Sequence, residues 1–213
     1  MQSTMNSTGT RINLMRFSEV FVTLWGDTVR AQSALVDGVK TKQVLDQFWA
    51  RTMLRSFFAF VEGITYELKL VIEGAVDDGM FDVSHEEWFA LLEFTYELDS
   101  DGKVHQRPRF VALERQLRFV FQLAARLFGC EPLPLGDARF DDFRRSLHLR
   151  NSITHPKDPD ALKLRPEDIH RVIRGMRWFA DVLVLLHERW KEQGLIEDVP
   201  STTDPGASDL PDD

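Results

Sequence analysis

The chain has 213 residues, of which 43% are hydrophobic, and it carries a formal net charge of −8 and one cysteine. Because Cys130 is the only cysteine, a disulfide framework and a zinc site built from cysteine pairs are both excluded. No apolar run approaches the ~18 residues that cross a bilayer, and the polar start lacks the apolar stretch of a secretory signal. We therefore expect a cytoplasmic protein that inserts into no membrane.

The charge is distributed unevenly along the chain. Residues 1–102 carry 16 acidic and 8 basic side chains, whereas residues 103–174 carry 15 basic and 9 acidic ones. Residues 197–213 contain six acids and no base. A positive segment inside an acidic protein can attract phosphates locally, because a groove of one sign focuses its own field. The alternative is that most of these arginines lie on solvated helix faces.

Both ends of the chain are expected to be disordered, over residues 1–13 and 197–213, because they are polar and offer little apolar surface to bury. Residues 14–196 are expected to form one helical domain, with an N-terminal helical extension over about 14–80 and a motif-bearing core over about 84–194. Apolar residues spaced three and four apart predict a helix from Phe17 and a longer one over about 41–76.

A third helix is predicted to open at Ser84, since Ser84 and Glu87 have the spacing of a capping box. An Asp-Gly turn dipeptide within residues 96–105 then predicts a short hairpin or ordered loop. The acidic residues here match the first positions of an EF-hand loop. The twelfth position is Pro108, which cannot supply the bidentate carboxylate that calcium needs, so we exclude calcium.

Three more helices are predicted to run from Pro108 to Gly129, from near Asp137 to Pro156, and from Pro166 to Gly194. The expected fold is therefore all-α, a bundle of about five to six helices with a short hairpin or loop insertion. No sequence signature of a dinucleotide-binding loop, a P-loop, a zincin or a hydrolase nucleophile elbow occurs, and we expect neither a metal nor a cofactor.

One segment stands apart chemically, because Arg150, Asn151 and His155 lie within six residues and Pro156 follows directly. On an ideal helix Asn151 and His155 share a face, whereas Arg150 and His155 lie about 140° apart around the axis. Pro156 disfavours the helical conformation at His155, so the histidine can turn away at the helix end. The negative end of the helix also favours a protonated imidazole.

This combination of side chains suits RNA cleavage by attack of the 2′-hydroxyl on the adjacent phosphorus. That reaction needs a base for the hydroxyl proton and an acid for the departing 5′-oxygen, and a histidine can serve as either. A guanidinium such as that of Arg150 meets the charge that develops on the phosphoryl oxygens. Asn151 can hold one of these groups or the phosphate in place, and no metal is required.

The string from Arg150 to His155 resembles the R-polar-x-x-x-H motif of the HEPN superfamily (higher eukaryotes and prokaryotes nucleotide-binding domains). The resemblance implies a helical bundle that forms a homodimer with the two motifs facing each other. It also implies a metal-independent endoribonuclease of the toxin–antitoxin or antiviral-defence type, with RNA as substrate and an antitoxin or other protein as a further partner. Arg150, Asn151 and His155 would then be catalytic. The long N-terminal half and the acidic net charge depart from the family pattern.

Four flanking residues are candidates for phosphate binding without base recognition: Arg144, Arg145, His148 and Lys157. Two hypotheses of different classes remain for the chain. In the first it is an endoribonuclease; in the second it is a non-catalytic helical dimer module that binds a protein or a nucleotide and uses the same residues structurally, with Arg150 exposed and His155 capping the helix.

Overall fold

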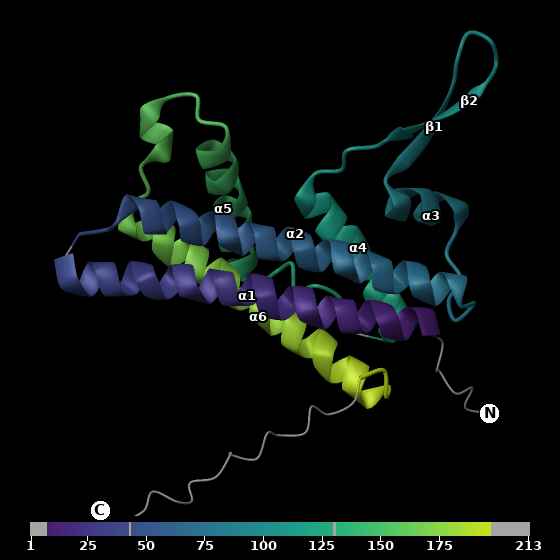
Figure 1. Ribbon diagram of the computed structural model, residues 1–213, viewed down its shortest axis with the longest axis horizontal. Helices are drawn as coiled ribbons and strands as arrows, with labels where there is room; N and C mark the ends of the chain where they lie inside the picture. Colours follow the sequence, from purple (N-terminus) through teal and green to yellow (C-terminus); the bar gives the residue numbers. More distant parts are fainter. Residues whose placement is uncertain (1–7, 43, 130, 197–213) are drawn as a thin grey trace, which may run out of the picture.

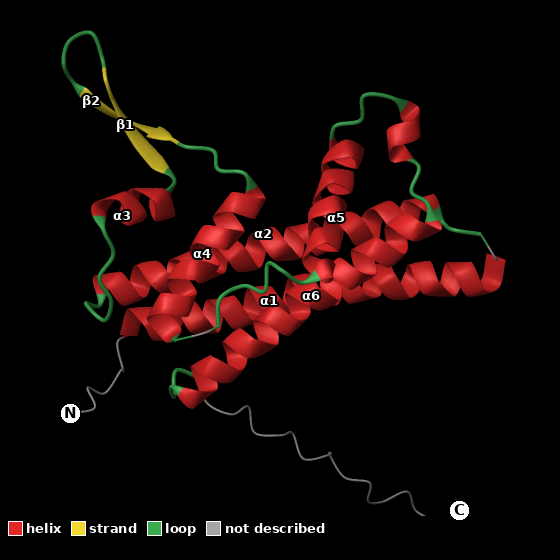
Figure 2. Ribbon diagram, turned by 180° about the vertical axis from the view of Figure 1, so that it is seen from behind, coloured by secondary structure: helices red, strands yellow, loops and turns green. Residues whose placement is uncertain are grey.

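The computed structural model describes residues 8–42, 44–129 and 131–196, and the chain is an all-α bundle with one small hairpin (Figures 1 and 2). Residues 1–7 and 197–213, which were expected to be disordered, lie outside the described residues, as does Cys130. The elements in chain order are α1 (Thr8–Lys42), α2 (Gln47–Asp77), α3 (His85–Leu92), β1 (Phe94–Leu98), β2 (Val104–Pro108), α4 (Leu113–Phe128), α5 (Ala138–Thr154), the 3-10 turn η1 (Pro159–Leu162) and α6 (Pro166–Glu192).

The N-terminal half forms a long antiparallel pair of helices, α1 and α2. The prediction of disorder up to residue 13 was wrong for residues 8–13, which are already helical. Asn13 shows why order begins this early, because its side-chain amide donates to the carbonyl of Leu70, 2.7 Å away on α2. The prediction that one helix starts near residue 41 was also wrong. There α1 ends at Lys42, and α2 starts at Gln47 after Asp46, whose carboxylate accepts two N–H groups of the first turn.

Helix α2 is the centre of the bundle and packs against α1, α4, α5 and α6. Its interior is aromatic: Phe57 lies 6.1 Å from Phe143 of α5, and Phe60 lies 5.7 Å from Phe179 of α6, both edge to face. The buried residues form one continuous core that includes Leu14 at one end of the chain and Trp190 at the other. The predicted extension over 14–80 and the motif-bearing segment over 84–194 therefore share this core.

The capping box at Ser84 is present, and it opens the short helix α3 as predicted. The predicted hairpin is also present: β1 and β2 are antiparallel, and they extend away from the bundle (Figure 2). The prediction that Pro108 opens a helix was wrong, because Pro108 ends β2 opposite Phe94 and α4 starts only at Leu113. Proline has no N–H to donate to the ladder, and in an edge strand such as β2 this loss is tolerated.

Helices α5 and α6 start and end close to the predicted positions. Asp137 caps α5 through the N–H of Arg139, and α6 starts at Pro166. The two helices approach closely at Gly175, where a β-carbon would lie only 2.9 Å from Cα of Phe143. This contact fixes α5, and with it the sequence motif, against the bundle.

Candidate active site

The motif lies at the C-terminal end of α5. This helix ends at Thr154, as the sequence predicts from Pro156, and His155 has φ −125° and ψ 66°, so the chain leaves the helix there. The backbone N–H of His155 still donates to the carbonyl of Asn151 at 3.0 Å. The imidazole therefore starts from a fixed backbone position one residue beyond the helix.

Arg150 is held by two partners. Its Nη2 donates to Oε1 of Glu62 on α2 at 2.5 Å, and its Nη1 donates to Oδ1 of Asn151 at 3.1 Å. The Arg150 side chain is 25% exposed and that of Glu62 is 42% exposed, so the pair lies at the edge of the bundle. The prediction for a structural role placed Arg150 on the exposed surface, but the guanidinium is half-buried against α2.

Three further polar residues of α2, one turn apart, hold the end of the motif and the segment that follows it. Arg55 donates from Nη2 to the carbonyl of Ile153 at 3.3 Å, and Arg51 donates from Nη1 to the carbonyl of Leu162 at 3.1 Å. Gln47 makes two bonds of 2.8 Å with the backbone of Leu164, one to its carbonyl and one from its N–H. Ile153 is among the last four residues of α5, whose carbonyls have no partner inside the helix, so Arg55 also caps that helix.

Glu62 and these three residues of α2 were not predicted from local sequence spacing. They lie at intervals of four, four and seven residues along a helix that is otherwise mostly apolar. Polar side chains repeated at helical spacing in an apolar helix are a detectable signal that one face meets polar groups. The spacing does not indicate which groups they bind. These contacts define the motif end, by which we mean the C-terminal turn of α5 with the side chains of α2 that contact it.

His148, Asn151 and Arg144 are exposed, and they follow one face of α5 at helical spacing. His155 is exposed as well, and its imidazole has no hydrogen-bond partner among the described residues. The structure therefore brings Arg150 and Asn151 into direct contact, and it places His155 next to them along the chain without a side-chain contact. Arg145 and Lys157 are also exposed, so both are accessible to solvent.

Arg144 lies two turns before the motif and is already paired with acids. Its Nε is 3.1 Å from Oε1 of Glu114 on α4, and its Nη1 is 3.7 Å from Oδ1 of Asp141. Burial raises the pKa of Glu114, but the hydrogen bonds from Arg118 and Arg144 outweigh burial and leave this pKa below its ordinary value. Arg144 therefore ties α5 to α4, and its positive charge is largely neutralised.

The motif end brings together three arginines, of which Arg150 binds the carboxylate of Glu62 and the other two bind backbone carbonyls. Arg51, Arg55 and Arg150 lie at its inner side, and His155 is free at the helix end. A phosphate that approached Arg150 would compete with Glu62 for Nη2, since both are acceptors for the same donor. Other donors of the guanidinium remain available for a second oxygen.

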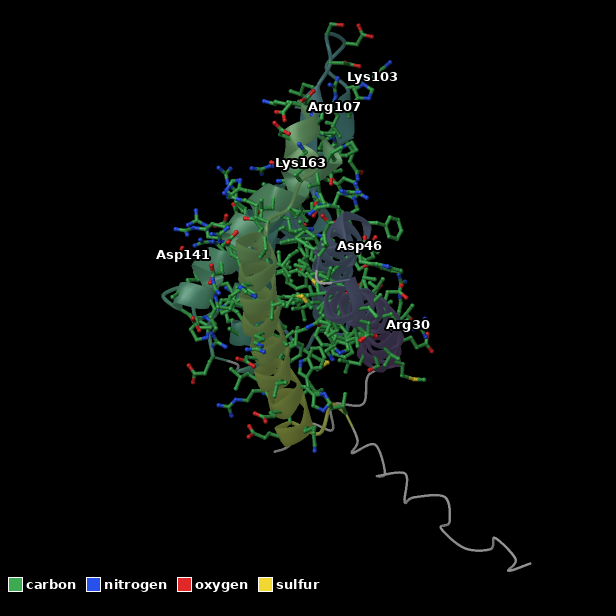
Figure 3. The ribbon with its side chains drawn as sticks, turned by 90° about the vertical axis from the view of Figure 1, so that its left-hand side faces the viewer. Arg30, Asp46, Lys103, Arg107, Asp141 and Lys163 are labelled. Atoms are coloured by element: carbon green, nitrogen blue, oxygen red, sulfur yellow. The ribbon has the colours of Figure 1, made fainter. Side chains whose placement is uncertain are left out.

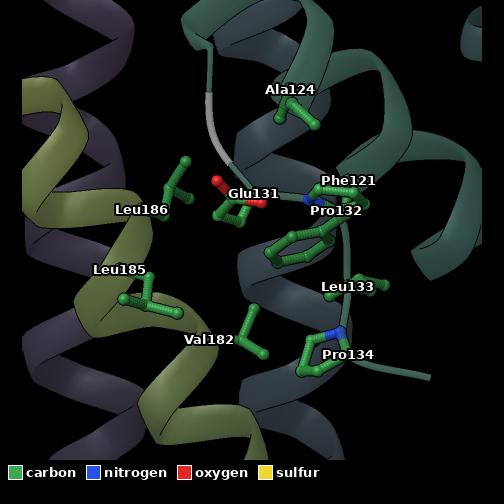
Figure 4. A pocket seen from close by; sticks show the side chains of 10 residues that line it. Phe121, Ala124, Glu131, Pro132, Leu133, Pro134, Val182, Leu185 and Leu186 are labelled. Atoms are coloured by element: carbon green, nitrogen blue, oxygen red, sulfur yellow. The ribbon is translucent and has the colours of Figure 1, made fainter. Parts of the chain in front are cut away.

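The described part of the chain also has an apolar groove between α1 and α6, but no metal-binding cluster. None of its His, Cys, Asp and Glu residues cluster in threes with a geometry suited to a metal ion. A cavity of about 20 Å³ lies between α4, α6 and residues 131–134, and apolar side chains such as Phe121 and Val182 line most of it (Figure 4). This space is about that of one water molecule, so it is a packing gap. No described helix has the length and apolar character of a membrane span.

Comparisons with known proteins give no relative for this chain. No protein-family model, no curated protein and no solved structure matches it. The similarity to the HEPN superfamily therefore depends on the motif from Arg150 to His155 and on its position at a helix end.

Proposed function

We propose that the chain is a metal-independent endoribonuclease of HEPN type, and that Arg150, Asn151 and His155 are its catalytic residues. The observation that carries the proposal is the fixed guanidinium of Arg150, held by Glu62 and Asn151 beside the point where His155 leaves α5. The exposed imidazole of His155 supports a proton-transfer role, because it is accessible to a substrate.

In this reaction the 2′-oxygen of RNA attacks the adjacent phosphorus, and the bond from phosphorus to the 5′-oxygen breaks. His155 of one subunit takes the 2′-hydroxyl proton or protonates the leaving oxygen, and in a symmetric dimer the second copy supplies the other role. Arg150 stabilises the charge on the phosphoryl oxygens, and Asn151 keeps the guanidinium in place. Arg145, His148 and Lys157 contact flanking phosphates. The proposed setting is the cytoplasm, in a toxin–antitoxin or defence role with an antitoxin or other protein as partner.

The test is cleavage of a defined RNA by the purified chain in the presence of EDTA. Wild type is expected to leave 2′,3′-cyclic phosphate ends and to spare an RNA with 2′-deoxyribose at the cleaved position. Arg150→Ala and His155→Ala are expected to lose activity by at least the ~100-fold typical of one acid–base group, while they stay folded. His170→Ala and Arg174→Ala are matched controls on α6; the first is exposed and the second removes an ion pair with Asp142. Activity that requires metal, or that survives both motif substitutions, refutes the proposal.

The second candidate is a non-catalytic dimer module, and the ion pair between Arg150 and Glu62 favours it. In this candidate function the guanidinium, which already has a carboxylate partner, fixes α5 on α2. In that case wild type leaves RNA intact. In a double-mutant cycle, Arg150→Ala and Glu62→Gln then change only the free energy of unfolding. A coupling of about 0.5–1 kcal/mol in unfolding, with no cleavage by any variant, identifies this module.

A further inference from the structure

Helix α1 exposes a row of apolar side chains on the face that is directed away from the core. Met15, Val22, Val29 and Val36 follow one another at intervals of seven residues, and they are between 39% and 69% exposed. A seven-residue apolar repeat is the pattern of a helix that packs along another helix. Among the described elements α1 packs mainly on α2, which covers the opposite face. Helix α2 therefore leaves this row exposed to solvent.

Gly26 lies in the same face, and a β-carbon added there would meet no atom within 4 Å. A second helix could therefore approach closely at this point. The face is also remote from α5: Figure 3 places Arg30 of α1 and Asp141 of α5 on opposite sides of the molecule. A helix that packs along this face is therefore remote from the start of α5.

Two charged residues of α1 on this face favour a second copy of this chain as the partner. Glu19 and Lys40 are exposed on the same face, and neither has a side-chain partner among the described residues. Glu19 lies ten residues before Val29, and Lys40 lies eleven residues after it. An antiparallel second copy of α1, related by a two-fold axis beside Val29, would therefore place each Glu19 next to the partner's Lys40. A parallel copy would place like charges together, which is unfavourable.

The apolar row is self-complementary under the same symmetry. Val29 meets Val29 of the partner subunit at the axis, and Val22 meets the partner's Val36. From Met15 to Lys40 the face is about 38 Å long at 1.5 Å per residue. A strip of this length and about 10 Å width buries roughly half of the ~800 Å² per subunit of a standard interface. Additional contact area is therefore needed.

A groove beside α1 supplies this area. It has a volume of about 660 Å³ between α1 and α6, and it is lined mainly by apolar side chains, among them Phe21, Trp25 and Phe60. Ser18 and Val22 line it from the exposed side of α1. In the antiparallel arrangement Val22 lies opposite the partner's Val36, and Ser18 lies opposite the partner's Lys40. The C-terminal half of each α1 therefore covers the groove of the other copy.

We propose that α1 is an interface for a second copy of this chain, antiparallel and two-fold symmetric about a point beside Val29. This interface does not depend on the ribonuclease proposal, because it leaves α5 outside the contact. A dimer with facing motifs would use a different surface.

Cysteine cross-linking tests the geometry directly. In a chain with Cys130→Ser, mild oxidation is expected to link Val29→Cys to itself, because the two Cα atoms meet at the axis. Val36→Cys is the matched control: its Cα atoms are separated by about 21 Å along the antiparallel pair, whereas a disulfide spans at most ~7 Å. Arg150→Ala added to the Val29→Cys chain should leave the cross-link unchanged. Linking of both cysteines indicates a parallel pair, and linking of neither indicates no interface; each result overturns the proposal.

Charge reversal gives an independent measurement by sedimentation at several protein concentrations. Glu19→Lys and Lys40→Glu are each expected to weaken the dimer several-fold, because like charges then meet across the interface. The double variant is expected to recover the wild-type dissociation constant, since the opposite pairing is restored between copies. A double variant that is no tighter than either single one contradicts the antiparallel arrangement. If the chain shows no ribonuclease activity but Val29→Cys still cross-links, only the ribonuclease proposal is contradicted.

Discussion

The close approach of α5 and α6 predicts the effect of one added methyl group. In Gly175→Ala the new β-carbon would lie 2.9 Å from Cα and 3.0 Å from the backbone nitrogen of Phe143. The contacted atoms belong to a helix backbone, so no side-chain rotation relieves the contact. Helix α5 must move outward by about 0.5 Å to restore ordinary van der Waals separation.

Two effects of opposite sign determine the change in stability. Replacing glycine by alanine in a helix interior stabilises the folded state by about 1 kcal/mol. Forcing a methyl group into a packed contact costs about 1–3 kcal/mol, and the upper part of this range applies because the neighbour is backbone. We expect a net loss of about 1–2 kcal/mol, which lowers Tm by about 2–4 °C per kcal/mol in a chain of this size.

Thermal and urea unfolding followed by circular dichroism measure this difference. Gly38→Ala on α1 is the matched control, because its β-carbon would meet only Cβ of Asp46 at an ordinary 3.8 Å. That variant is expected to gain about 0.5–1 kcal/mol from helix propensity. If Gly175→Ala is as stable as wild type while Gly38→Ala is stabilised, then α5 and α6 do not pack as described.

Three further substitutions test other contacts. Glu93→Gln removes the carboxylate 3.1 Å from the ammonium of Lys69, whose side chain is only 6% exposed. Because Glu93 itself is a third exposed, we expect the free energy of unfolding in urea to fall by about 1–3 kcal/mol. An unchanged midpoint would contradict this pairing. The hydrogen bond from Arg126 lowers the pKa of Glu87 below its ordinary 4.5. The ion pair therefore stabilises the fold above pH 4.5, and this stabilisation is lost as the pH falls through the lowered pKa. The difference in Tm between wild type and Glu87→Gln should shrink from pH 6 to pH 3, and a constant difference argues against the ion pair. Trp178→Ala empties a fully buried position and should cost about 3–5 kcal/mol by the same unfolding measurement, with a smaller loss showing that the site collapses.

The helix boundaries that were predictable are those with a local chemical signal. Ser84 and Asp137 each accept N–H groups of the helix that follows, and Pro166 opens α6. Pro108 shows the limit of such signals, because proline is acceptable both in the first turn of a helix and at a strand end. The pairing with Phe94 decided between them, and a pairing between strands is not visible in local spacing.

In the candidate site, too, only the contacts between sequence neighbours were predictable. Arg150 and Asn151 are neighbours in the sequence, so their contact follows from the motif itself. Glu62 is 88 residues away from Arg150, and no periodicity relates the two. Their contact depends on how α5 crosses α2, which is set by packing around Phe143 and Gly175.

The bonds from α2 to the motif end also bear on the order in which the protein forms. Gln47 and Leu164 are 117 residues apart, and Arg55 and Ile153 are 98 apart. Contacts between such distant segments require long loops to close, and they therefore form slowly. During synthesis α2 leaves the ribosome well before Leu164 does, so α2 waits for the segment that it holds. The contacts of α2 with the motif and with Leu164 therefore form only after residues 150–164 have left the ribosome, and a shorter nascent chain carries α2 without them.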